Sequence, residues 1–147
     1  MTPIGTALVV GFIILLIIAI WIDKQANKRF TKEISEKYPP KESFGAFFIT
    51  EKGELLRYCG SGTLVGYKKW NLADISYINS YKGDVSFHND KKKVMRGEYL
   101  TPSKKKFLKE KAYATFSVGY DNVPDFINFI KKYGPHIQHM VGGEIQE

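Results

Sequence analysis

The sequence contains little of what catalytic and metal sites need: one cysteine, Cys59, and three histidines, His88, His136 and His139, in 147 residues. One cysteine excludes an intramolecular disulfide scaffold, and no Cys/His cluster has the spacing of a structural zinc site. The length excludes a large multidomain enzyme, because it suffices for one ordinary domain and little more. Residues 1–22 carry no charged side chain at all.

The charge that is present is mostly positive, with 22 Lys+Arg against 15 Asp+Glu and a formal net charge of +7. Such a balance invites a nucleic-acid-binding interpretation. However, the strand-like segments hold few Lys or Arg, and no basic side chains alternate with aromatic ones along a strand, as a single-strand-binding surface needs. We therefore expect no nucleic acid among the partners.

The uncharged stretch from Ile4 to Ile22 predicts a membrane-spanning helix. Its nineteen residues rise about 28 Å at about 1.5 Å per residue, which matches a hydrocarbon core of about 30 Å. Trp21, followed by Asp23 and Lys24, is typical of the membrane interface. We expect a transmembrane anchor over residues 1–23.

A cleaved secretory signal is the alternative for this stretch. It would need basic residues before a shorter apolar core, and then a small-x-small cleavage site. No Lys or Arg precedes the stretch, and Ile18-Ala19-Ile20-Trp21 offers no good cleavage site. An uncleaved anchor is therefore favoured.

Five basic residues follow the span within the distance over which the positive-inside rule acts. They are Lys24, Lys28, Arg29, Lys32 and Lys37. This flank predicts a single-pass protein of the cell membrane (plasma or inner membrane), with its amino terminus outside and its carboxyl-terminal domain in the cytoplasm.

Residues 24–38 predict an amphipathic juxtamembrane helix. Its apolar residues recur every four positions, at Ala26, Phe30, Ile34 and Tyr38. Lys24, Lys28 and Lys32 lie on another face, and together with Arg29 they are candidates for contact with anionic lipid headgroups. The alternative is a connector that packs on the domain. Pro39-Pro40 ends the helix, because proline cannot continue its hydrogen bonds.

After this boundary the apolar period changes from about four to two, which predicts short strands separated by turns. The expected strand segments are Phe44–Ile49, Leu55–Tyr58, Thr63–Tyr67, Trp70–Tyr81, Val85–His88, Val94–Gly97 and Ala112–Val118. Strands at this spacing indicate an antiparallel sandwich or barrel.

One helix follows the strands. Pro124 suits its first turn, Asn122 or Asp121 lies near its cap, and Gly134-Pro135 stops it. Its apolar stripe consists of Phe126, Ile127, Ile130 and Tyr133. Residues 136–147 show no period and are expected to be a flexible tail.

Two passages resemble bacterial pleckstrin-homology-like (PH-like) domains. Lys69-Trp70-Asn71-Leu72-Ala73-Asp74-Ile75-Ser76-Tyr77-Ile78 is similar to one of their strands, and Val123–Ile130 to their carboxyl-terminal capping helix. The resemblance covers roughly Phe44 to Tyr133. Together with the predicted anchor, it implies an α+β chain: an amino-terminal transmembrane helix, then a PH-like antiparallel β-barrel or sandwich of about seven strands over residues 39–135, closed by a carboxyl-terminal helix.

The uncharged span, the basic flank and the strand-rich domain with one terminal helix favour a binding or interaction module rather than an enzyme. The expected partners are membrane lipid, through an anionic surface, and a protein. The alternative within the binding class is a self-protection (immunity) protein against a membrane-active bacteriocin, because some membrane-anchored bacterial proteins with such domains resemble that class.

Two lysine runs are further candidates for contact with a membrane surface. One is Lys91-Lys92-Lys93, expected at a hairpin tip, and the other is Lys104-Lys105-Lys106. The alternative is that both are solvated loop tips. Phosphoinositide binding is not implied, because the loop from Thr50 to Glu54, in the place of the basic first hairpin of phosphoinositide-binding PH domains, has one lysine between two glutamates.

Catalysis is not expected. Cys59 would need a histidine base, and nothing places one beside it. An enzyme that uses Cys59 therefore stays only an alternative. His136 and His139 have the spacing of a shared metal site, but no glutamate completes a recognised pattern. The glycines at 60, 62 and 66 lie between strands, whereas a phosphate loop lies between a strand and a helix. No cofactor or metal is expected.

Overall fold

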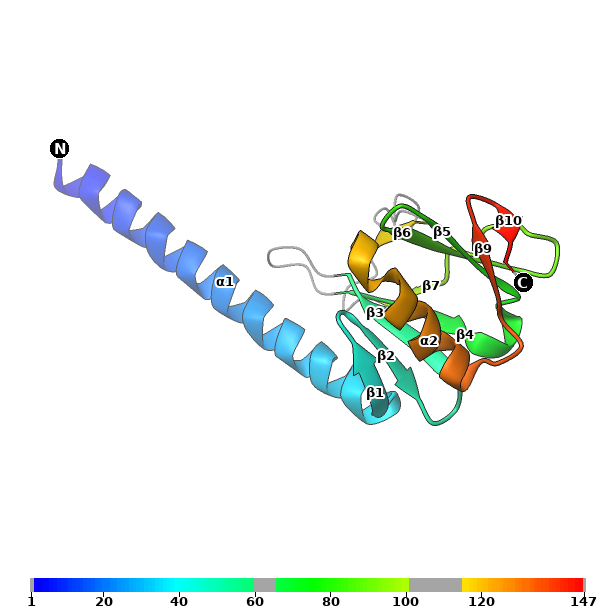
Figure 1. Cartoon of the computed structure of the whole chain (residues 1–147). Helices are drawn as coiled ribbons and strands as arrows, with labels where there is room; N and C mark the ends of the chain where they lie inside the picture. Colours follow the sequence, from blue (N-terminus) through cyan, green and yellow to red (C-terminus); the bar gives the residue numbers. More distant parts are fainter. Residues whose placement is uncertain (1, 60–65, 101–114, 147) are drawn as a thin grey trace.

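A computed structural model describes residues 2–59, 66–100 and 115–146. Helix α1 (Pro3–Lys37) projects away from a domain that contains two five-stranded sheets and helix α2 (Val123–Tyr133), as Figure 1 shows. The chain is therefore α+β, as predicted. Within the described residues neither sheet closes into a barrel, and the structure has more strands than the seven expected.

Helix α1 is continuous across the boundary between the apolar and the basic segments. Thr2 caps its start by accepting a hydrogen bond from the Gly5 amide at 3.1 Å, and Pro3 occupies its first turn. The helix ends at Lys37, immediately before the two prolines, and the Tyr38 amide donates to the Ile34 carbonyl at 2.8 Å. Its most apolar 18-residue window has a mean hydropathy of 2.8. Helix α1 is thus long and apolar enough to span a membrane.

The first sheet has the order β1-β2-β3-β4-β7, and all its pairs are antiparallel. Its strands are β1 (Pro40–Phe44), β2 (Phe47–Thr50), β3 (Glu54–Tyr58), β4 (Tyr67–Asn71) and β7 (Glu98–Leu100). The single strand predicted over Phe44–Ile49 is wrong. A turn at Gly45-Ala46 joins β1 and β2 there, and Gly45 has the positive φ of +57° that a tight hairpin turn needs.

The second sheet has the order β10-β9-β5-β6-β8. Its strands are β5 (Tyr77–Tyr81), β6 (Asp84–His88), β8 (Phe116–Ser117), β9 (Gln138–Val141) and β10 (Glu144–Ile145), and the short helix η1 (Leu72–Asp74) precedes it. Two predicted strands differ: Trp70–Tyr81 is split between β4 and β5 by η1, and Val94 makes only an isolated bridge to His88. Of the predicted segments Thr63–Tyr67 and Ala112–Val118, residues 63–65 and 112–114 lie outside the described residues.

The tail predicted for residues 136–147 is also wrong over residues 137–145. Strand β9 pairs in parallel with β5, and β10 pairs with β9. Ile137 and Met140 are only 1% and 2% exposed. The segment showed no period because a four-residue strand and a two-residue strand, separated by the Gly142-Gly143 turn, are too short to display one.

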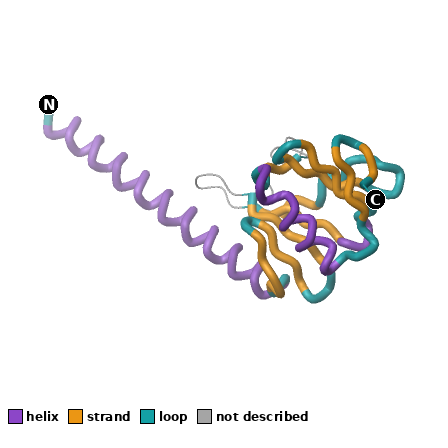
Figure 2. The backbone as a smooth tube through the Cα atoms, viewed as in Figure 1, coloured by secondary structure: helices purple, strands orange, loops and turns teal. Residues whose placement is uncertain are grey.

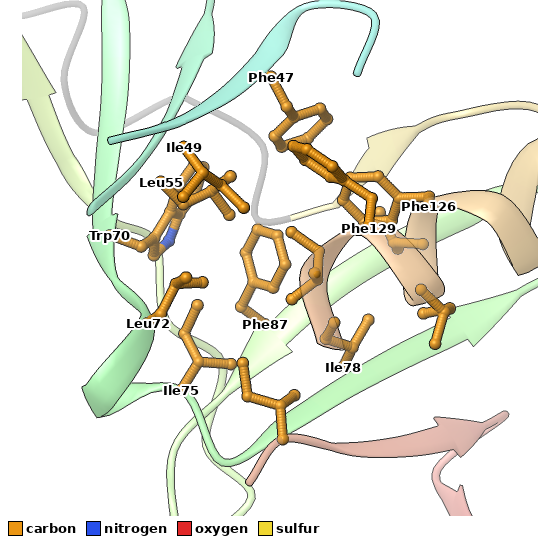
Figure 3. Close-up of a cluster of buried hydrophobic side chains, with 14 of the residues drawn as sticks. Phe47, Ile49, Leu55, Trp70, Leu72, Ile75, Ile78, Phe87, Phe126 and Phe129 are labelled. Carbon is orange, nitrogen blue, oxygen red and sulfur yellow. The ribbon is translucent and has the colours of Figure 1, made fainter. Parts of the chain in front are cut away.

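The predicted carboxyl-terminal helix is confirmed as α2, with Pro124 in its first turn and Gly134 at its end. A short helix, η3 (Tyr120–Asn122), leads into it. Figure 2 shows α2 lying across the domain while α1 extends outside it. Phe126 and Ile130 are fully buried, and the rings of Phe126 and Phe47 lie 4.8 Å apart. In Figure 3, Phe126 and Phe129 point from α2 toward Phe87 and Phe47, so the helix completes the core between the two sheets.

The outer face of the first sheet carries a second, smaller apolar cluster. Ile34 and Tyr38 at the end of α1 pack with Leu56 and Tyr67, and Phe30, Phe48 and Leu100 lie against them. Strand alternation explains the two faces, because Leu55 and Trp70 point into the main core while Leu56 and Tyr67 point out. The first sheet is therefore covered on both faces, and the last turns of α1 belong to the domain.

Candidate membrane-facing end of the domain

The packing of α1 on the first sheet fixes the orientation of the domain relative to the helix axis. Phe30 contacts Tyr67, with ring centroids 6.0 Å apart. Two turns later, Tyr38 accepts a hydrogen bond from the Lys69 Nζ at 3.4 Å. Strand β4 therefore runs from Tyr67, on the side of the apolar half of α1, toward Asn71 on the side away from it.

We call the side of the domain nearer to the apolar half of α1 the proximal end. It contains the end of β3 at Tyr58, whose amide donates to the Ala46 carbonyl at 2.9 Å and so brings the β1–β2 turn to the same end. The Arg57 guanidinium lies 4.6 Å from the ring centroid of Phe116. Phe116 begins strand β8, and Val118 follows that strand. The Val118 amide donates to the Gly83 carbonyl at 2.9 Å, so the β5–β6 turn lies at the same end.

Three exposed tyrosines lie at this proximal end. Tyr58 is 42% exposed, Tyr81 is 58% exposed and Tyr120 is 75% exposed. Lys82, in the β5–β6 turn, places its Nζ 5.3 Å from the centre of the Tyr81 ring. Tyrosine is enriched at membrane–water interfaces, where the ring is apolar and the hydroxyl is wet. Sequence reasoning missed this group, because its members are 23 and 39 residues apart and only the fold brings them to one end.

The basic residues predicted on the juxtamembrane helix all lie on α1 beside its apolar half. Lys24, Lys28, Arg29 and Lys32 are exposed, as is Trp21 at 61%. The apolar side of this segment packs on the domain, as a connector would. Its basic side is exposed and is therefore free to meet lipid headgroups. Contact of these residues with lipid stays a prediction.

The lysines Lys91, Lys92 and Lys93 lie at the opposite end of the domain. They are exposed and occupy the turn after β6, where the Asn89 Oδ1 accepts from the Lys91 and Lys93 amides at 3.0 and 2.9 Å. In Figure 1 this turn is on the far side of the domain from the apolar half of α1. The structure therefore does not bring this run together with the basic side of α1. The other run, Lys104, Lys105 and Lys106, lies outside the described residues.

A cluster of cations lies inside the proximal end. Arg57 on β3 pairs in register with Lys68 on β4, both on the inner face of the first sheet. Lys68 is only 2% exposed. Burial lowers the pKa of the Lys68 ammonium, and the charges of Arg96 and Arg57 lower it further, although Cys59 acts in the opposite sense. The signal that sequence reasoning overlooked is that Arg57 and Lys68 fall on the same alternation as Leu55 and Trp70.

Cys59 and the histidines do not form a common site within the described residues. Cys59 interacts with Arg57, whose Nη1 donates to the Sγ at 3.3 Å. The His136 Nε2 donates to the Leu72 and Ile75 carbonyls at 3.0 Å each, whereas the His139 Nε2 lies 2.7 Å from the Ser80 hydroxyl. The described part of the chain has no group of three His, Cys, Asp or Glu that could hold a metal ion.

The chain was compared with family models, with curated proteins and with solved structures, and nothing matches it in any of the three. The resemblance to PH-like domains therefore stays a prediction, and the functional argument depends on the geometry of the proximal end.

Proposed function

We propose that the chain is a single-pass, membrane-anchored binding module, with its amino terminus outside and a PH-like domain that works against the anionic cytoplasmic surface of the cell membrane. The observation that carries this proposal is the packing of α1 on the first sheet through Phe30, Ile34 and Tyr38. A helix that belongs to the domain cannot act as a loose tether. The domain must therefore present one particular end to the bilayer.

The distance along α1 supports contact with the bilayer. Phe30 comes eight residues after Ile22, the last uncharged residue of the span, which corresponds to about 12 Å of helix. The headgroup region extends about 5 to 7 Å beyond the hydrocarbon core. Phe30 thus lies about 5 Å beyond the headgroup region, a gap that the exposed tyrosines of the proximal end have to cross. The basic residues that precede Phe30 on α1 are closer to the headgroups, where each Lys or Arg contributes about 1 kcal/mol of attraction to anionic lipid.

Hydrogen exchange of the full chain in lipid nanodiscs tests the proposal. We expect amides of the β5–β6 turn at 82–83 and of residues 117–122 to exchange more slowly in nanodiscs that contain phosphatidylglycerol than in neutral detergent. The turn at residues 89–93, at the opposite end, is the internal control and should exchange equally in both. Equal exchange at both ends would remove the bilayer from the proposal and leave a protein as the partner.

The orientation has its own test. A reporter that is active only in the cytoplasm, fused after Glu147, should be active in cells. A fusion that is well expressed but inactive would show that the domain lies on the other side of the membrane, where the anionic cytoplasmic leaflet is not available to it.

A further inference from the structure

A pocket of about 340 Å³ lies at the proximal end, between the β1–β2 turn and the segment that leads into α2. Phe44, Phe47 and Val118 give it apolar walls, and Arg57, Ser117 and Asn122 supply polar groups. This size is at the lower end of the range for small-molecule sites, and the exposed lining is divided about equally between apolar and polar groups. The positive charge of Arg57 favours an anionic ligand over a cationic one.

Arg57 is held in place while most of its hydrogen-bond donors have no acceptor within the described part of the chain. Its guanidinium stacks 4.6 Å from the ring centre of Phe116 and 5.7 Å from that of Phe47. Of its five N–H groups, one donates to the Cys59 Sγ, and the Nε is buried with no hydrogen-bond partner. A guanidinium fixed in this way loses little side-chain freedom when it binds a ligand.

Among residues 2–59, 66–100 and 115–146, no carboxylate forms an ion pair with Arg57. The three ion pairs found among the described residues are made by Lys69 and Lys132. Two acids lie on neighbouring elements: Asp84, in register with Ser117, and Asp121, in the helix before α2. Both are exposed, and neither is paired with Arg57. Buried Lys68, in register with Arg57, has its Nζ 5.3 Å from the centre of the same Phe116 ring.

We propose that this pocket binds the phosphate group of an anionic phospholipid, with the Arg57 guanidinium as its principal contact and the apolar walls against the glycerol and the first carbons of the acyl chains. Phosphate is the chemistry that an arginine fork recognises best, since it accepts two parallel N–H bonds. The proposal depends on the proposed function for its source of phosphate, because only a domain fixed at the bilayer surface has its proximal end among the headgroups.

The test is native mass spectrometry of the full chain in detergent micelles titrated with phosphatidylglycerol or, for comparison, phosphatidylcholine. The wild type should retain phosphatidylglycerol preferentially. Arg57→Leu should weaken that retention at least about tenfold, the usual effect of losing a charge-assisted pair. Lys91→Leu, which removes one positive charge at the opposite end, is the matched control and should retain the lipid as the wild type does.

A second variant covers the case in which Arg57→Leu does not fold. Ala46 lines the same pocket at the exposed β1–β2 turn, so Ala46→Trp should fill the pocket without changing any charge and should lower retention by a similar factor. Folding of each variant is checked by circular dichroism. Folded variants that both retain phosphatidylglycerol like the wild type would overturn the site.

Soluble glycerol 3-phosphate distinguishes the two sources of phosphate. If it displaces the lipid from the wild type and does not bind to Arg57→Leu, the anion site stands and its ligand is a free phosphate ester. The hydrogen-exchange experiment separates the two proposals, because protection of the proximal end in nanodiscs requires only that this end meets the bilayer. If the proximal end stays protected in nanodiscs but Arg57→Leu does not weaken the retention of phosphatidylglycerol, the phosphate site is overturned and the proposed function is not.

Discussion

The ring of Phe30 lies 6.0 Å from the ring of Tyr67, and this contact joins the helix that can span a membrane to the first sheet of the domain. Ile34 and Tyr38 continue the contact toward the end of the helix. Because three successive turns of α1 face the sheet, the domain is fixed in direction as well as in position.

The first prediction concerns Ile34, which is 6% exposed between α1 and the first sheet. We expect Ile34→Ala to lower the free energy of unfolding of the domain by about 2 kcal/mol, because truncation removes buried methyl groups and leaves a gap. Thermal or urea unfolding of the full chain in detergent measures this loss. Glu33→Ala, at an exposed position on the same turn, is the control and should change the value by less than about 0.5 kcal/mol. Equal effects of the two would show that α1 does not pack on the sheet.

Long periodic segments were the part of the fold that could be predicted from the sequence. The apolar run of α1 and the stripe of α2 each extend over enough residues for their period to be clear. The hairpin at Gly45 could not be predicted, because Phe44 and Phe47 flank the turn with apolar residues that read as one strand. Strand β9 was missed because its place is decided by pairing with β5, 61 residues away in the sequence, and not by its own pattern.

Of the candidate site, only the basic side of α1 was predicted from the sequence, and the buried cations were not. The basic side of α1 is visible in the sequence because its residues are close together in it. Arg57 and Lys68 were missed because a cation on an alternating strand is ordinarily assigned to the solvent side. Their alternation with Leu55 and Trp70 was the overlooked signal for the inner face. The register of β3 with β4 then sets them side by side, near Phe116 from the other sheet.

The second prediction concerns the carboxyl-terminal strands. Met140 is 2% exposed, whereas its neighbour Val141 is 44% exposed. We expect Met140→Ala to cost about 2 to 3 kcal/mol of unfolding free energy, because it removes a buried side chain from the core. Val141→Ala is the matched control and should cost less than about 0.5 kcal/mol. Urea unfolding of the two variants in detergent would give equal midpoints if residues 137–145 were a loose tail.

The third prediction concerns pH. Burial lowers the pKa of the His139 imidazole below its ordinary value of 6.5, and the charge of Lys131 lowers it further. The unfolded chain therefore takes up this proton first as pH falls. Neutral His139 therefore contributes fully to the free energy of unfolding above about pH 6.5. We expect this contribution to be lost progressively below that pH, until His139 is protonated in the folded state as well.

His139→Asn should flatten the dependence of unfolding free energy on pH between pH 7 and pH 5, measured by urea unfolding in detergent. Glu42 does not interfere in this window. A hydrogen bond from Tyr133 and the neighbouring Lys132 lower the pKa of its carboxyl from the ordinary value of 4.5, so its contribution is lost only below that pH. An unchanged slope in His139→Asn would assign the pH dependence to another group.

The last prediction uses the continuity of α1. We expect a neutral seven-residue helical segment, inserted between Gln25 and Ala26, to move the domain about 10 Å from the bilayer while turning it by only about 20°. The contacts of Phe30, Ile34 and Tyr38 lie after the insertion and stay intact, so the unfolding temperature should not change. The protection of residues 117–122 in phosphatidylglycerol nanodiscs should be lost, because the proximal end no longer reaches the headgroups. The same segment added after Glu147 is the control for the extra length and should preserve the protection. If protection persists in both, the slow exchange arises within the domain and the bilayer has no part in it.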